Sequence, residues 1–333
     1  MNSATPQWIE AQTEKLLAQR GHAWLLSGPA GLGQYELALS LVRAWLCEQP
    51  QAGAACGHCA SCHAIDVRTH ADLCVLMPET WMLELGWPLS EKAQADLDEK
   101  KRKPSKEIRI EAMRDAVDFS QRTSARGRGK AVLVYPAEDM NAFTANALLK
   151  TLEEPPGDVR FVLASEAAHQ LLPTIRSRCL VHTMAWPNAL DSQAWLEAQG
   201  VAAQHAAVAL KAQGGRPLAA LHWAESGQDP ALWAALPKLI ARGDVQALRD
   251  WTPQQLISAQ QHLCHDLMAV AVSAEPRFFH KSDLLSGVPL AVLSKWWASL
   301  QTHRRTMDHP FNPGLFIEVL VEEARAALST SAI

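Results

Sequence analysis

A short apolar run that ends in a glycine-rich segment is the feature that most restricts the fold of this chain. Residues 23–27 read Ala-Trp-Leu-Leu-Ser, and residues 28–33 read Gly-Pro-Ala-Gly-Leu-Gly. Apolar residues then return at helical spacing from residue 36 to residue 47. A strand, a glycine loop and a helix in this order are typical of a phosphate-binding loop, in which backbone amides cradle phosphate groups.

Later segments of the chain extend this pattern into an α/β fold. Apolar runs predict strands at residues 131–134 and 160–164, and residues 141–154 predict a helix that stops at Pro155-Pro156. This helix places one apolar face inward, formed by Ala145, Leu148, Leu149 and Leu152. Because strands alternate with helices, we expect a parallel sheet covered on both faces.

The C-terminal half of the chain has a different pattern. From residue 186 onward strand-like runs largely disappear, and apolar residues recur at helical spacing up to Leu328. Breaker segments at residues 214–217 and 227–230 divide this half. We therefore predict an α/β domain at 1–185, a small helical domain at 186–228 and a larger all-helical domain at 229–333.

The glycine loop lacks the side chains that act on ATP. A working loop reads G-x-x-x-x-G-K-[ST], where the lysine reaches the β and γ phosphates and the hydroxyl holds magnesium. Gly28, Gly31 and Gly33 are present, but Gln34 replaces the lysine and Tyr35 replaces the serine or threonine. Glutamine carries no charge to offset a triphosphate, so we expect no functional ATP site in this chain.

The acidic pair of such a site is also missing. It should follow a buried strand and hold magnesium, but the strand at 131–134 runs into Tyr135-Pro136. The next acidic residues, Glu138 and Asp139, lie too far past the strand. We interpret them as a helix N-terminal cap before Asn141. The losses agree with one another, which argues against an unusual working site.

Four of the seven cysteines lie close together in the sequence. Cys47, Cys56, Cys59 and Cys62 have the spacing C-x8-C-x2-C-x2-C, which allows four thiolates to surround one ion tetrahedrally. We predict a structural zinc site. An iron–sulfur cluster is the weaker alternative, because the ferredoxin spacing needs a cysteine where Asp66 stands. Unligated buried cysteines, and substitution by His58, His63 or His70, are further alternatives; Cys74 and Cys264 are predicted to be core residues.

Composition argues against two broad classes of protein, autonomous DNA-binding proteins and membrane proteins. The formal net charge is −4, which disfavours an autonomous DNA-binding protein. No apolar stretch approaches the length of a membrane span and the N-terminal residues lack a secretory pattern, so we expect a cytoplasmic protein.

A charged segment at 90–106, within an insertion at about 77–106, is interpreted as solvated, with a basic docking patch as the alternative. The C-terminal tryptophans are expected to pack in the helical core, with base stacking as the alternative.

Several motifs together carry a family resemblance. They are the degenerate glycine loop, the four-cysteine segment after its helix, the run Ala-Asn-Ala-Leu-Leu-Lys-Thr-Leu-Glu-Glu-Pro-Pro at 145–156, and the triplet Ser177-Arg178-Cys179. Over residues 8–185 the chain resembles the bacterial DNA polymerase III clamp-loader subunits of the AAA+ superfamily. Its departures at Gln34, Tyr35, Tyr135 and Pro136 are similar to those of the catalytically silent delta-prime members.

The resemblance implies a set of partners and roles. It implies an AAA+ RecA-like module, a helical lid and a helical collar that assembles with gamma/tau and delta subunits into a hetero-pentamer, which loads the sliding clamp (beta) onto primed DNA. Arg178 would act as an arginine finger on ATP bound by a neighbouring subunit, with Arg176 as the adjacent candidate. Arg216 resembles the lid arginine that senses nucleotide, and is interpreted as a structural remnant.

Two other functional hypotheses stay open on the residues alone. The chain could be an ATP-hydrolysing gamma/tau-like subunit that uses unusual residues, or a zinc-containing DNA-binding protein on the same fold. The leading hypothesis is a subunit of the DNA polymerase III holoenzyme that neither hydrolyses ATP nor polymerises DNA.

Overall fold

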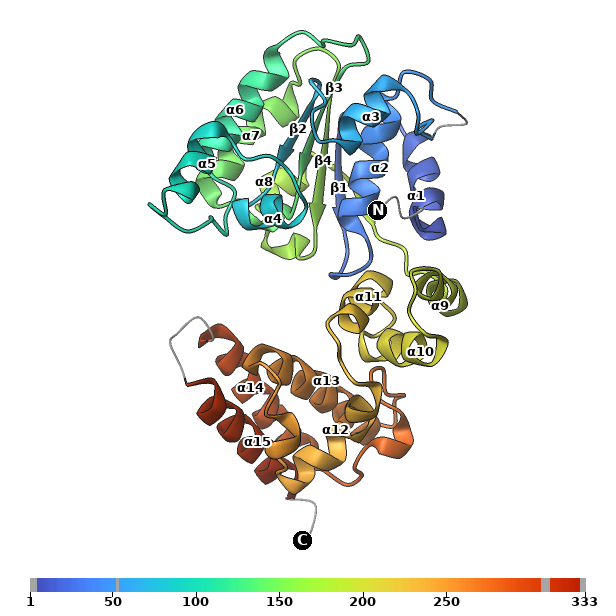
Figure 1. Cartoon of the computed structure of the whole chain (residues 1–333), viewed down its shortest axis with the longest axis vertical. Coiled ribbons are helices and arrows are strands. Elements are labelled where there is room, and N and C mark those ends of the chain that lie inside the picture. Colours follow the sequence, from blue (N-terminus) through green and yellow to red (C-terminus); the bar gives the residue numbers. More distant parts are fainter. Residues whose placement is uncertain (1–4, 52–53, 307–311, 330–333) are drawn as a thin grey trace. The chain divides into compact units, whose positions relative to one another are not determined.

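The computed structural model describes residues 5–51, 54–306 and 312–329 of the chain, and the first four residues of the N-terminal stretch considered above lie outside them (Figure 1). The chain forms two compact units, residues 1–187 and 188–333. The predicted division of the second unit at residue 228 stays a prediction. Among the described residues, no helix is long and apolar enough to cross a membrane.

The first unit is built on a five-stranded parallel sheet. Its strands are β1 (Ala23–Ser27), β2 (Leu73–Leu76), β3 (Lys130–Val134), β4 (Val159–Ser165) and β5 (Leu180–Thr183), in the spatial order β2-β3-β4-β1-β5. The predicted strands β1, β3 and β4 are confirmed. The strands β2 and β5, which lie at the two edges, were not predicted.

Helices cover both faces of this sheet (Figure 1). They are α1 (Gln7–Leu17), α2 (Gln34–Leu46), α3 (Ala60–Asp66), α4 (Glu79–Glu84), α5 (Glu91–Asp98), α6 (Ile110–Gln121), α7 (Ala142–Glu153) and α8 (Pro173–Arg176). Side chains alternate along a strand, so Trp24 and Leu26 pack in the apolar layer with α1 and α2, whereas Leu25 packs in the opposite layer with α6 and α7. Burial on both faces explains why β1 is a continuous apolar run.

Local signals explain where α7 begins and ends. The Asn141 side chain accepts a hydrogen bond from the backbone N–H of Thr144 at 3.0 Å, so Asn141 itself is the N-cap. The expectation that Glu138 and Asp139 cap this helix is therefore wrong; they lie in a separate 3₁₀ turn, η1 (Ala137–Asp139). The helix ends before Pro155-Pro156, as expected from the missing proline donors.

An ion pair within the insertion holds the end of its charged run in place. The short helix α5 of the insertion buries no residue, in line with the prediction of a solvated segment. However, Arg102 pairs with Glu79, whose side chain is only 9% exposed and which also accepts the backbone N–H of Ser105 at 2.8 Å. The end of the charged run is thus tied down, although its lysines face solvent.

In its described residues, 188–306 and 312–329, the second unit contains helices and no strand. It contains α9 (Ala189–Ala198), α10 (Ala203–Ala212), α11 (Pro217–Glu225), α12 (Pro230–Arg242), α13 (Pro253–Ala271), α14 (Leu290–Thr306), α15 (Pro313–Ser329) and the 3₁₀ turns η3 (Gln246–Leu248) and η4 (Lys281–Asp283). The predicted α/β N-terminal module and the helical C-terminal half are confirmed. Buried tryptophans and Cys264 form part of one core; they are Trp223, Trp233, Trp251 and Trp296, with Trp297 packed at its edge. The packing interpretation of these tryptophans is confirmed.

Candidate functional site

The glycine loop connects β1 to α2 and is closed by its own glutamine. Gly31 and Gly33 have φ values of 86° and 100°, a region that glycine adopts without strain. The Gln34 side chain is 2% exposed, and its amide nitrogen donates to the carbonyl oxygens of Gly28 at 2.7 Å and Pro29 at 2.9 Å. The side chain at the lysine position therefore bonds back to the loop instead of reaching outward to a phosphate.

Aromatic rings pack around Tyr35 and Tyr135, which stand at the sequence positions where a working site has its magnesium ligands. The rings of Tyr35 and Tyr135 lie 5.4 Å apart, and Trp81 lies 5.5 Å from Tyr135 with its edge toward the ring. Trp87 donates from its indole N–H to the Tyr35 hydroxyl at 2.8 Å. We call these four residues the aromatic cluster. Two of its members come from the insertion, so the insertion helps to fill the degenerate site.

The polar atoms around the aromatic cluster bond to one another. The Tyr135 hydroxyl donates to Glu166 Oε1 at 3.0 Å, and the backbone N–H of Glu166 donates to Glu138 Oε1 at 2.9 Å. Burial, with the Glu166 carboxylate beside it, raises the pKa of Tyr135; burial also raises the pKa of Tyr35, so both phenols stay neutral at physiological pH. Glu138 thus supports the local backbone and is not presented at the end of β3.

Asp139 also lies close to the end of β3. Burial, followed by the nearby Glu138 and Glu107 carboxylates, raises its pKa to about 6. Asp139 belongs to the 3₁₀ turn η1 and not to β3, so it does not take the place of the strand-end acid.

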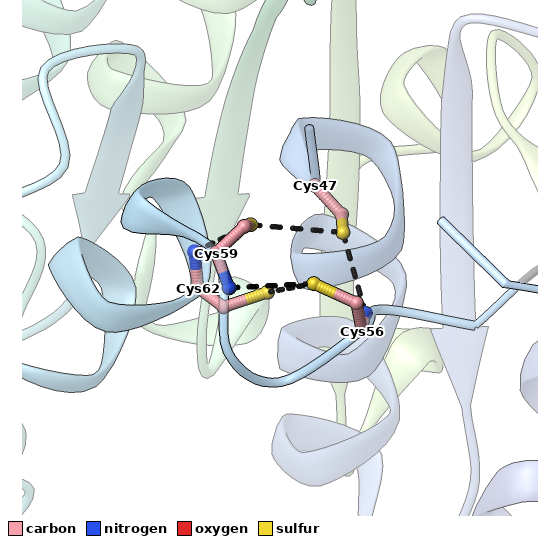
Figure 2. A group of neighbouring side chains, drawn as sticks. All are labelled: Cys47, Cys56, Cys59 and Cys62. Carbon is pink, nitrogen blue, oxygen red and sulfur yellow. Dashed lines mark hydrogen bonds between the residues drawn. The ribbon is translucent and has the colours of Figure 1, made fainter. Parts of the chain in front are cut away.

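The four cysteines predicted as metal ligands lie together at the end of α2 and the start of α3 (Figure 2). All four sulfur atoms are within 4.8 Å of one another, with Cys47 and Cys59 sulfurs 3.8 Å apart and Cys56 and Cys62 sulfurs 4.0 Å apart. Four sulfurs at a Zn–S bond length of about 2.3 Å stand about 3.8 Å apart in a tetrahedron. The donor set therefore fits one tetrahedral metal ion.

Backbone N–H groups point at these sulfurs. The N–H of Cys56 donates to Cys47 Sγ at 3.3 Å, that of Cys59 to Cys56 Sγ at 3.4 Å, and that of Cys62 to Cys59 Sγ at 3.4 Å. Burial raises the pKa of the Cys59 thiol, but hydrogen bonds from the backbone N–H groups of Cys62 and Glu48 and from the neighbouring thiols lower it to about 6, whereas burial raises the pKa of Cys47, and raises that of Cys62 to about 12. Thiolates are the form that binds metal, so the peptide loop favours the ligand state at Cys59.

The histidines near the cluster have other contacts. His70 is buried; its Nδ1 accepts the Asp72 backbone N–H at 3.0 Å, and its Nε2 lies 3.1 Å from Ser61 Oγ. His58 contacts the carbonyl oxygen of Cys56 at 2.8 Å. In the part of the chain that the structure describes, the four cysteines are the one group of three or more His, Cys, Asp or Glu side chains arranged for a metal ion.

Arg178 lies in the turn between α8 and β5. Its Nε donates to Glu153 Oε1 at 2.8 Å, its Nη2 donates to the same oxygen, and its Nη1 donates to the Thr174 carbonyl at 2.8 Å. The Arg178 side chain is 28% exposed and that of Glu153 is 49% exposed. The guanidinium is therefore held in place at the surface, where a partner could reach it.

The other two candidate arginines are placed differently. Arg176 is exposed at the end of α8. Arg216 stands before α11 in the second unit and donates from its Nε to the Gln213 carbonyl at 2.7 Å. Its bond to the preceding turn agrees with the interpretation of Arg216 as a structural residue, which stays a prediction.

Two sets of residues carried no predicted role. Trp81 and Trp87 contact Tyr135 and Tyr35 across the fold, and no local pattern marks that contact. Glu153 belongs to the run at 145–156, but its partner Arg178 lies 25 residues downstream. From the sequence alone, any acidic residue near Arg178 would have been an equally good candidate for its hydrogen-bond partner.

Comparison with known proteins gives consistent matches. The family model described as "DNA polymerase III, delta subunit" matches residues 6–187. A DNA polymerase III subunit delta' from Pseudomonas aeruginosa is 40% identical over 191 residues, which cover 57% of this chain and 51% of that protein. One from Yersinia pestis is 31% identical over 270 residues, covering 78% and 70%. A DNA polymerase III subunit tau from Escherichia coli is 33% identical over 159 residues, covering 48% and 21%. The chain thus spans about half the length of the first of these relatives.

Proposed function

The chain belongs to the family of DNA polymerase III delta' subunits, and from this premise we propose that it is a clamp-loader subunit that does not itself hydrolyse ATP. The observation that carries the second part is the interior of its glycine loop. Gln34 bonds to the loop carbonyls, and Tyr35 and Tyr135 of the aromatic cluster stand at the sequence positions of the magnesium ligands. Neither a phosphate lysine nor a magnesium-binding carboxylate is offered there.

We propose that Arg178 completes the ATP site of a neighbouring gamma/tau subunit. An arginine is a permanent cation with a planar fork of donors, and it can stabilise charge that develops on a transferring phosphoryl group. The exposed position of Arg178 and its hydrogen bonds to one carboxylate and one carbonyl support this role. The chain would thus act in trans while its own loop is silent.

The four-cysteine group is proposed to hold one structural Zn²⁺. The sulfur separations and the N–H groups directed at the sulfurs support a tetrahedral thiolate site. Four protein ligands leave no open position, so the ion would fasten α2 to α3 and take no part in a reaction. Measuring the metal content of the purified chain, and its loss on replacing Cys59 by serine, tests the identity of the ion.

The partners follow from the family and from the proposed finger. We propose that the chain assembles with gamma/tau and delta subunits in a hetero-pentamer, and meets the sliding clamp and primed DNA through that complex in the cytoplasm. The net charge of −4 supports contact with DNA as part of a complex rather than alone. Co-purification of the chain with candidate gamma/tau and delta subunits tests the assembly.

The finger is tested by alanine substitution in the reconstituted complex. Arg178→Ala is expected to lower ATP turnover at the site it completes by about 10³-fold, while assembly is unchanged. Arg176→Ala is the matched control, since it removes an exposed arginine two residues away. Normal DNA-stimulated turnover with Arg178→Ala would exclude the finger, and ATP turnover by the isolated chain would exclude the non-hydrolysing role.

A further inference from the structure

The hydrogen bonds of Arg178 fix the orientation of its guanidinium group as well as its position on the surface. Glu153 is the last residue of α7, and its Oε1 receives both the Nε and the Nη2 hydrogens of the guanidinium. The Thr174 carbonyl receives a hydrogen from Nη1 on another side. Two separate helices, α7 and α8, therefore hold one side chain.

The remaining donors of the guanidinium are suited to a phosphate. Arginine carries five N–H groups, one on Nε and two on each terminal nitrogen. Glu153 takes two of them and Thr174 takes one, which leaves one N–H on Nη1 and one on Nη2 apart from a long 3.5 Å contact of Nη1 with Ser177 Oγ. Both terminal nitrogens thus keep a donor for phosphate oxygens while the Nε edge is anchored.

An arginine held in this way starts with less freedom to lose. A free arginine samples many rotamers, and ordering it at the moment of reaction has an entropic cost. The Glu153 carboxylate restricts that freedom in advance, while its 49% exposure keeps the ion pair weak enough for the guanidinium to adjust toward a phosphate with several negative charges.

Building on the proposed finger, we propose that Glu153 is a positioning residue that orients Arg178 for the ATP of the neighbouring subunit. It contacts neither the nucleotide nor the reacting atoms and acts through the arginine. This gives a role to the first glutamate of the Leu-Glu-Glu-Pro-Pro segment, where it ends α7 beside the Ser-Arg-Cys turn.

The test compares glutamate variants in the reconstituted complex with gamma/tau and delta subunits. Glu153→Ala is expected to lower the kcat of DNA-stimulated ATP turnover on the order of tenfold, with KM for ATP unchanged, because a misplaced group loses turnover and not substrate binding. Glu153→Gln, which keeps an acceptor oxygen at the same distance, is expected to fall between wild type and alanine. Glu154→Ala is the matched control, as it removes the adjacent exposed glutamate.

A double substitution separates positioning from a general structural role. If Glu153 acts only through the arginine, Glu153→Ala causes no further loss of kcat in an Arg178→Ala complex. A further loss, an unchanged kcat with Glu153→Ala alone, or a raised kcat would each overturn the proposal; a raised kcat would show that Glu153 restrains the arginine instead. If Arg178→Ala itself leaves turnover normal, the finger and its positioning residue fail together, whereas a defect with Arg178→Ala alone removes only the role of Glu153.

Discussion

The glycine loop and the Ser-Arg-Cys turn adjoin neighbouring strands of one sheet, yet the polar side chain of the loop is buried and that of the turn is partly exposed. The loop follows the end of β1, and the turn precedes the start of β5, which pairs with β1 in parallel. In the loop, Gln34 is buried and bonds to the chain's own carbonyls. In the turn, Arg178 is anchored along one edge and stays partly exposed.

This difference separates a polar group that is satisfied within the fold from one that keeps donors for a partner. A polar group that acts on a partner must keep donors or acceptors that the fold does not use, whereas a group recruited into the core has its bonds satisfied internally. The loop region meets the second description through Gln34 and the Tyr135–Glu166 hydrogen bond. Four predictions test this contrast. Changes around the loop are expected to alter the stability of the fold, whereas a change at Arg178 is expected to leave it nearly unaltered.

Metal removal should have the largest effect, and it should be confined to the loop side. α2 begins at the loop and ends next to Cys47, so the proposed metal would anchor the helix that carries Gln34. We expect chelation to lower the free energy of unfolding by on the order of 5 kcal/mol or more, as binding energy at such sites is folding energy. Hydrogen exchange should then rise across α2 and much less at residues 173–183. Equal protection of α2 with and without chelator would contradict a structural metal.

Truncating the aromatic cluster should have the next largest effect. Tyr135 is 6% exposed and packs against Tyr35 and Trp81, so Tyr135→Ala is expected to cost about 3–5 kcal/mol of unfolding free energy. Arg178→Ala removes a partly exposed ion pair and should cost less than about 1 kcal/mol. Urea denaturation of both variants measures the difference. Similar losses for the two would break the contrast between the regions.

Asp139 should show a smaller effect that depends on pH. Its folded-state pKa of about 6 lies above the ordinary value near 4, so the stability provided by its neutral form is present below about pH 4 and is lost as pH rises through about 6. We expect Asp139→Asn to gain about 1 kcal/mol over wild type at pH 7, after discounting for solvent screening, and to gain nothing below pH 4. Unfolding curves at these two pH values test it; a variant less stable at pH 7 would contradict the sign.

Restoring the loop signature should have the smallest effect. We expect the double variant Gln34→Lys and Tyr35→Thr to show no ATP binding at about 1 mM nucleotide, because Trp81, Trp87 and Tyr135 remain beside the loop and no carboxylate ends β3. Calorimetric titration of ATP with magnesium measures this. Clear binding by the double variant would show that Gln34 and Tyr35, and not the remaining aromatic residues Trp81, Trp87 and Tyr135, keep the loop silent.

Local sequence patterns predicted some elements and missed others for physical reasons. The strands β1, β3 and β4 are buried on both faces and read as continuous apolar runs. β5 is an edge strand, with Leu180 44% and Val181 60% exposed, and its pairing with β1 depends on a partner about 150 residues away. β2 has four residues and buries only the last. Neither gives a local signal as strong as that of the central strands.

The sites differ in the same respect. Three of the four cysteines lie within seven residues, so spacing alone brought the metal group together. The Tyr35–Trp87 bond joins residues 52 positions apart, and the Arg178–Glu153 pair joins residues 25 apart. Such contacts form only when the sheet brings distant segments together, so they can be inferred only after the order of the strands in the sheet is known.

The filled loop also bears on whether the stability of this chain depends on the nucleotide concentration around it. A protein that binds ATP gains stability as ATP rises, by RT ln(1 + [L]/Kd), and changes its population of states when ATP is spent. Under the proposed function, Gln34 and the aromatic cluster stand in place of a ligand, and that dependence would have no site to act through. The melting temperature of the isolated chain would then be the same in ATP, in ADP and in neither, and Arg178 would be presented unchanged through every round of its neighbours' hydrolysis.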